Sequence, residues 1–92
     1  MKTQHFVYML ACRDETYYIG YTTDLKRRVN EHNTSPKAAK YTRGRRPVTL
    51  VYYVACESRS DALKTEHALR KLTRSQKEAL IEHFEIKNND DG

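Results

Sequence analysis

Apolar positions along the chain fall into three strand-like runs separated by polar segments. The first run, Phe6–Cys12, is apolar on both faces, and residues 17–22 form a second run after the polar turn at residues 13–16. Two such runs joined by a short turn predict a β-hairpin. The third run, Val48–Cys56, has the strongest strand pattern in the chain, and we predict that it forms the central strand of a sheet.

The polar segments contain the signals of three helices. Capping residues mark the start of each predicted helix: Thr23 or Asp24 caps the first, and the capping-box patterns Ser58–Asp61 and Thr73–Gln76 open the other two. The three helices are predicted to end near residues 32, 72 and 86. The order β-β-α-β-α-α predicts an α+β fold with a small, mainly antiparallel three-stranded sheet flanked by helices. We expect one domain over residues 1–86 and a polar C-terminal tail over residues 87–92.

Length and composition narrow the class of protein. The chain has 92 residues, of which 38% are hydrophobic, and this is the size of one small domain. Its longest apolar runs are about half of the roughly 20 residues that a membrane-spanning helix needs, so we expect no membrane span. Two cysteines cannot form a disulfide framework, and no signal peptide precedes Phe6. These features favour a cytoplasmic location.

Positive charge is concentrated in one segment. The chain carries 17 Lys and Arg against 12 Asp and Glu, a formal net charge of +5, and residues 33–47 contain five cations and no acid. Mutual repulsion in such a loop is relieved by a polyanion, and Tyr41 within it can stack on a base. We predict that this segment is a nucleic-acid-binding arm; the alternatives are a solvated loop or ion pairs to distant acids. The residues of the predicted arm are Lys37, Lys40, Tyr41, Arg43, Arg45 and Arg46.

Two polar residues of the first predicted helix lie beside its apolar stripe. At 100° per residue, Arg28 and His32 flank the side that Leu25 and Val29 present to the core. An arginine at this position needs an anion. The functional interpretation is a phosphate contact, and the alternatives are a structural salt bridge for Arg28 and a satisfied interfacial histidine for His32.

Glu66 lies in the middle of the apolar face of the second predicted helix, between Ala62 and Leu69. A carboxylate there requires a partner, either a hard cation such as Mg²⁺ or a facing basic side chain, with Arg28 as the candidate for an ion pair. In the second strand, Gly20 indicates a bulge or a place where another group approaches the backbone closely.

Taken together, these motifs resemble the GIY-YIG nuclease family, in particular its small stand-alone bacterial members. The resemblance covers about residues 5–80 and rests on Phe6-Val7-Tyr8, Tyr18-Ile19-Gly20, the run Asp24-Leu25-Lys26-Arg27-Arg28 with His32, and Glu66 in a helix. The step of ten residues from Tyr8 to Tyr18 fits the family spacing.

The resemblance implies a catalytic role for each of five residues. Tyr8 and Tyr18 would lie near the scissile phosphate with Tyr18 as the general base, Arg28 would contact the phosphate, His32 would assist water activation, and Glu66 would bind Mg²⁺ or Mn²⁺. The implied activity is metal-dependent hydrolysis of DNA in repair or processing, giving 5′-phosphate and 3′-hydroxyl ends, with RNA left open as a partner. Two alternatives have no such activity: a nucleic-acid-binding module on the same fold, and a protein-interaction adaptor.

Overall fold

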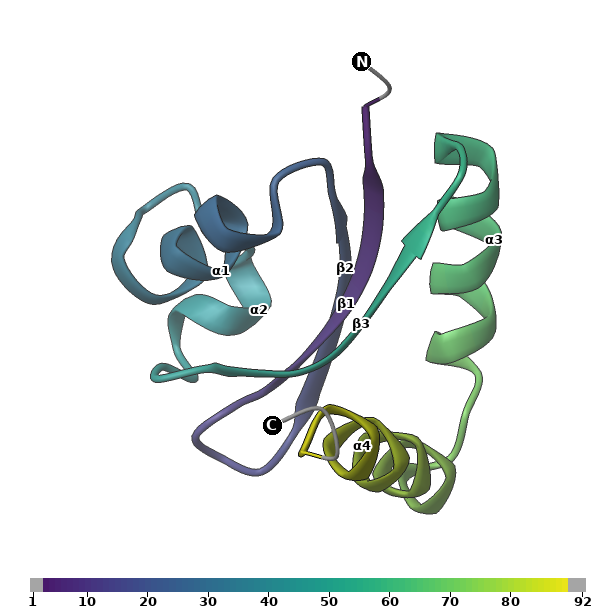
Figure 1. Ribbon diagram of the computed structural model, residues 1–92. Coiled ribbons are helices and arrows are strands. Elements are labelled where there is room, and N and C mark those ends of the chain that lie inside the picture. Colours follow the sequence, from purple (N-terminus) through teal and green to yellow (C-terminus); the bar gives the residue numbers. More distant parts are fainter. Residues whose placement is uncertain (1–2, 90–92) are drawn as a thin grey trace.

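The computed structural model describes residues 3–89. Figure 1 shows the arrangement of its elements, which are strands β1 (His5–Ala11), β2 (Tyr17–Thr22) and β3 (Thr49–Cys56) and helices α1 (Leu25–Thr34), α2 (Lys40–Arg43), α3 (Arg59–Arg70) and α4 (Arg74–Asn89). The three strands form one antiparallel sheet in the order β2-β1-β3. The predicted α+β class and the three-stranded sheet are therefore confirmed.

The central strand is β1, so the prediction that residues 48–56 would occupy the centre is wrong. Four successive residues of β1, from Val7 to Leu10, are at most 1% exposed, whereas β3 leaves Tyr53 40% exposed. An apolar run on both faces marks a strand covered by both neighbours and helices. The strength of its strand pattern favoured β3, which is an edge strand in the sheet.

Helices cover both faces of the sheet, with α1 and α2 on one side and α3 on the other (Figure 1). Because successive strand residues point to opposite faces, β1 contributes to two separate cores. One core joins Val7, Met9 and Ile19 to residues of α3 and α4, namely Ala62, Leu69 and Ile81. The other contains Tyr8, Leu10, Cys12 and Val48, with Leu25 and Val29 of α1 packed against it.

The predicted capping residues begin the helices. Asp24 Oδ1 accepts the Arg27 N–H at 3.2 Å, and Ser58 Oγ accepts the Asp61 N–H at 3.1 Å. Thr73 and Gln76 form a reciprocal capping box, because each side chain accepts the other's backbone N–H, at 3.2 and 2.9 Å. These bonds satisfy N–H groups that have no partner inside the helix.

Two boundaries differ from the sequence-based prediction. The segment 33–47, predicted as a loop, contains the single helical turn α2, and α4 continues to Asn89, three residues beyond its predicted end. The last three residues of the predicted tail, 90–92, lie outside the described residues. Within residues 3–89, no helix is long and apolar enough to cross a membrane.

Candidate active site

The hydroxyl end of Tyr8 lies directly over Gly20. These two residues are partners across the β1–β2 ladder, and the Tyr8 side chain is almost completely buried. A Cβ atom at position 20 would lie 2.5 Å from the Tyr8 hydroxyl oxygen and 2.6 Å from the ring carbon that carries it. Only glycine leaves room for this ring, so Gly20 marks a close approach rather than a bulge; the irregular register occurs in the β1–β3 ladder, between Met9 and Leu10.

We expect Gly20→Ala to destabilise the protein by about 1–3 kcal/mol, because the new methyl group must push a buried ring off its hydrogen-bond partner. Gly44→Ala is the matched control, since a Cβ there has no neighbour within 4 Å, and its effect should stay within about 0.5 kcal/mol. Chemical denaturation of both variants measures the difference. Equal stabilities would contradict the proposed close packing at Gly20.

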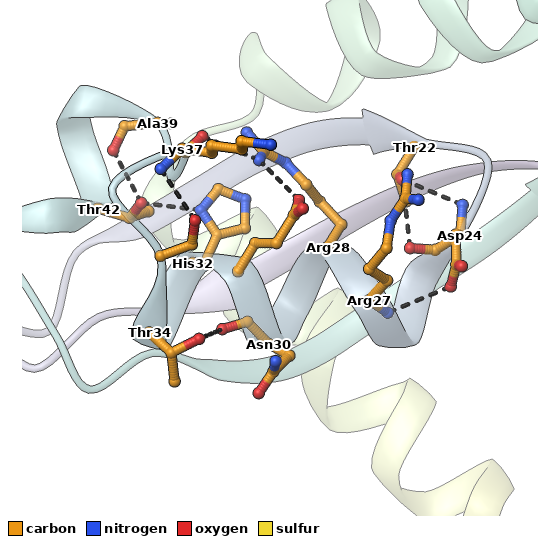
Figure 2. A network of polar contacts seen from close by, with 12 residues as sticks. Thr22, Asp24, Arg27, Arg28, Asn30, His32, Thr34, Lys37, Ala39 and Thr42 are labelled. Atoms are coloured by element: carbon orange, nitrogen blue, oxygen red, sulfur yellow. Dashed lines mark hydrogen bonds and ion pairs between the residues drawn. The ribbon is translucent and has the colours of Figure 1, made fainter.

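His32 connects β1 to α2 through two short hydrogen bonds. Its Nε2 lies 2.7 Å from the Tyr8 hydroxyl, and its Nδ1 lies 2.8 Å from Thr42 Oγ1. Figure 2 shows the second contact and its continuation to the Ala39 carbonyl oxygen, 3.0 Å from Thr42 Oγ1. The His32 and Thr42 side chains are fully buried. His32 is therefore the central member of a buried chain of polar groups.

Arg28 lies one helical turn before His32, and its side chain is held in place by two hydrogen bonds. Its Nη1 donates to Glu31 Oε1 at 3.2 Å and to the Lys37 carbonyl at 3.1 Å. Burial works against its charge, but the hydrogen bond to Glu31 and the nearby Tyr8 hydroxyl outweigh burial and raise the pKa of Arg28. The guanidinium therefore stays charged while a quarter of the side chain is exposed.

Burial sets the protonation states of Tyr8 and His32. It raises the pKa of Tyr8 to about 12, with the charges of Tyr18 and Glu66 adding to the effect and Arg28 opposing it. It lowers the pKa of His32 from 6.5 to about 4, and the Arg28 charge acts in the same direction. Both groups are therefore neutral at pH 7, with the phenolic proton on Tyr8.

These shifts predict how stability depends on pH. His32 takes up a proton more readily in the unfolded chain, so its contribution is present above pH 6.5 and is lost as the pH falls toward 4. Tyr8 loses its proton more readily in the unfolded chain, so its contribution is present below pH 10 and is lost as the pH rises toward 12. We expect a stability plateau between these limits, with an acid limb on the order of 2–3 kcal/mol. Urea titrations across pH measure it, and an acid limb that persists in His32→Gln would contradict the assignment.

Two further tyrosines form a side of the site. The Tyr18 ring lies 5.2 Å from the His32 ring and 5.9 Å from the Tyr41 ring, measured between centroids. The guanidinium carbon of Arg45 lies 4.0 Å above the Tyr41 ring. Tyr41 is 38% exposed, but the contact with Arg45 already uses one face of its ring. Aromatic rings therefore lead from the surface at Tyr41 to the buried Tyr8–His32 pair.

Glu66 has a basic partner, but not the predicted one. Its carboxylate Oε1 lies 3.4 Å from Arg70 Nη2 on the same helix, and 19% of the Glu66 side chain is exposed. Arg70 Nη2 also donates to the carbonyl of Ile19, which ties this turn of α3 to β2. The alternative of an ion pair between Glu66 and Arg28 is wrong, because Arg28 pairs with Glu31.

The carboxylate of Glu66 fits one mode of Mg²⁺ binding. Within residues 3–89, no group of three or more His, Cys, Asp or Glu side chains is arranged to hold a metal. Mg²⁺ commonly keeps several waters and binds through one or two carboxylates together with substrate phosphates. A single, partly exposed carboxylate is compatible with that mode, with the phosphate and waters supplying the other ligands.

The basic segment divides into anchored and free cations. Arg46 donates to the backbone carbonyls of His32 and Ser35 at the end of α1, and Arg45 forms an ion pair with Asp14 at 3.0 Å. For Arg45, the structure therefore shows an ion pair to a distant acid, which was one of the alternatives to nucleic-acid binding. The other three cations are exposed and form no ion pair with a described acid: Lys37, Lys40 and Arg43.

Sequence reasoning missed two members of this site. Thr42 lies inside the segment read as a loop, and nothing in its local pattern indicates a buried hydroxyl beside His32. Helical spacing puts Glu31 on the solvent side of α1, yet it holds Arg28. The spacing of three residues between Arg28 and Glu31 is the signal that could have found this pair.

The sequence matches a known family of domains. The GIY-YIG catalytic domain matches residues 4–79, more than three quarters of the chain. The chain therefore belongs to the GIY-YIG family, a family of nuclease domains, as the motifs predicted.

UPF0213 proteins are among its relatives. One from Halobacterium salinarum is 54% identical over 77 residues, which cover 84% of this chain and 99% of that protein. Another, from Listeria monocytogenes, is 47% identical over 79 residues, which cover 86% of this chain and 87% of that protein.

Two solved structures resemble the fold. A solution NMR structure of a protein from E. faecalis has a TM-score of 0.62 at 47% identity and covers 92% of this chain and 90% of its own. That of a UPF0213 protein from Bacillus halodurans has a TM-score of 0.55 at 46% identity, with 86% and 83% covered.

Proposed function

We propose that this protein is an endonuclease that hydrolyses DNA phosphodiester bonds with the help of a divalent cation. The observation that carries the proposal is the position of the Tyr8 hydroxyl, which bonds to His32 Nε2 at 2.7 Å and lies close enough to the Arg28 guanidinium for that charge to counteract part of the rise in the Tyr8 pKa. A proton acceptor and a fixed cation at one hydroxyl are the groups that attack of water on a phosphate needs. Membership of a nuclease family supports the same chemistry.

Tyr8 is a better candidate for the general base than Tyr18, which the motif first suggested. The Tyr8 hydroxyl has an acceptor for its own proton in His32, so it can receive a proton from water while it passes one on. The Arg28 charge counteracts part of the rise in the Tyr8 pKa that burial causes. Tyr18, whose ring packs between His32 and Tyr41, then has a positioning role.

Arg28 and Glu66 take the roles of charge stabilisers. The Arg28 guanidinium, fixed by Glu31, can bind the phosphate oxygens and offset the charge that builds up on them. Glu66 would hold Mg²⁺ or Mn²⁺, and when bound the cation neutralises the phosphate and the leaving 3′ oxygen. A phosphate at Arg28 also offsets the positive charge that lowers the pKa of His32, which makes His32 a better proton acceptor.

The proposal is tested by incubating the protein with supercoiled plasmid and with labelled single-stranded, branched and duplex DNA, and with matched RNA. Each is assayed with Mg²⁺, with Mn²⁺ and with EDTA. We expect metal-dependent nicking with 5′-phosphate ends. Binding of every substrate without cleavage under any condition would overturn the proposal and favour the alternative, a non-catalytic nucleic-acid-binding module.

The exposed cations should set the affinity for DNA. Neutralising Lys40 and Arg43 together, as glutamines, removes two candidate phosphate contacts, so the slope of log K against log salt should fall by about 2. Lys64→Gln on α3 with Lys71→Gln at its C-cap is the matched control for net charge. Fluorescence anisotropy over a salt series measures both. An equal loss in the two double variants would mean that net charge alone, and not the segment 33–47, binds the DNA.

A further inference from the structure

Thr42 occupies a position between His32 and the backbone that has no contact with solvent. Thr42 is fully buried and lies within the single turn α2. Its hydroxyl oxygen lies 2.8 Å from His32 Nδ1 and 3.0 Å from the Ala39 carbonyl oxygen. Figure 2 shows the Ala39 carbonyl, the Thr42 hydroxyl and the His32 ring joined in succession. With Tyr8 beyond His32, three consecutive short contacts join four polar groups.

The donors and acceptors in this series of four polar groups fit together in only one direction. A carbonyl oxygen can only accept, so the single proton of the Thr42 hydroxyl lies toward Ala39. Thr42 Oγ1 then accepts from His32 Nδ1–H, which leaves His32 Nε2 without a proton. Nε2 accordingly accepts the proton of the Tyr8 hydroxyl. In the reverse direction, the oxygens of Thr42 and Ala39 would face each other at 3.0 Å with no proton between them.

We propose that Thr42 is a positioning residue that fixes the tautomer of His32, so that Nε2 is held ready to accept the Tyr8 proton. The tautomer follows from the contacts alone; its consequence for catalysis rests on the proposed nuclease function. As water attacks phosphorus, its O–H bond breaks and the proton joins the Tyr8 oxygen, while the original Tyr8 proton joins His32 Nε2. Thr42 still accepts from Nδ1–H in the resulting imidazolium. Solvent protonates the leaving 3′ oxygen and takes the extra proton from His32 afterwards.

The closest alternative is that Thr42 only fills space. A valine has nearly the same shape, so Thr42→Val keeps the packing and removes the acceptor for Nδ1–H. Beside valine, an unpaired N–H at Nδ1 costs more than a bare Nδ1, so we expect the ring proton to move to Nε2, where it would donate to Tyr8 rather than accept. Thr42→Ser keeps the hydroxyl and loses only a methyl group. Together the two variants separate the hydrogen bond from the volume.

The test is ¹⁵N NMR of the His32 ring nitrogens at pH 7 in the whole chain, for wild type, Thr42→Ser and Thr42→Val. We expect a protonated Nδ1 and a bare Nε2 in wild type and Thr42→Ser, and loss of that pattern in Thr42→Val. In the cleavage assay kcat should fall at least about 10-fold for Thr42→Val and recover in Thr42→Ser, with unchanged DNA affinity. A wild-type ring protonated at Nε2, or a Thr42→Val ring that keeps Nδ1–H, would overturn the proposal. If wild type cleaves nothing, the nuclease function fails, while the NMR pattern still decides whether Thr42 sets the tautomer.

Discussion

Replacing Tyr8 by phenylalanine is expected to lower the rate of DNA cleavage by about 10²–10⁴-fold, the usual contribution of a general acid or base. The substitution removes one oxygen atom and leaves the ring over Gly20, so the shape of the site is kept. It also leaves His32 Nε2 buried without its donor, which should cost about 1–3 kcal/mol of stability. DNA affinity should not change, because Arg28 and the exposed cations are untouched.

The Tyr18→Phe variant tests whether Tyr8 or Tyr18, which the motif first suggested, is the general base. If Tyr8 is the base, Tyr18→Phe keeps the packing against His32 and Tyr41 and most of the activity. Single-turnover cleavage rates and thermal melts of both variants measure the contrast. A larger rate loss in Tyr18→Phe than in Tyr8→Phe would return the role of the base to Tyr18.

The sequence predicted which faces of the elements matter better than how they are arranged in space. Period-2 alternation puts Ile19 on one face of β2 and Tyr18 with Gly20 on the other, and the two cores show this division for Ile19 and Tyr18. The choice of the central strand was wrong, because β3 comes from a distant segment to pair with the other edge of β1, and pairing order is a tertiary property.

The candidate site shows the same division. Helical spacing identified Arg28 and His32 as residues beside the core, and apolar patterning singled out Glu66. It could not find Thr42, because the contact between Thr42 and His32 depends on how residues 35–47 fold back over the end of α1. Arg46 anchors that path on the carbonyls of His32 and Ser35. In the sequence, this anchor looked like one more cation for a nucleic acid.

Glu66→Gln is expected to abolish most metal-dependent cleavage, by about 10²–10³-fold, because the amide oxygen carries no net charge to hold a divalent cation. Stability should change by less than about 1 kcal/mol, since the lost ion pair is with Arg70, whose side chain is more than half exposed. Glu82→Gln on the exposed face of α4 is the matched control and should cleave like wild type.

A second measurement on Glu66 does not depend on turnover. Mn²⁺ is paramagnetic and broadens NMR signals near its site, so in wild type with a bound non-cleavable oligonucleotide we expect broadening centred on Glu66 and Ile19, which Arg70 joins. In Glu66→Gln that broadening should disappear while DNA binding persists. Broadening that is equal in both proteins would mean that the phosphates alone recruit the metal, and a cleavage loss in Glu66→Gln would then have to come from the charge that Glu66 exerts on Tyr8.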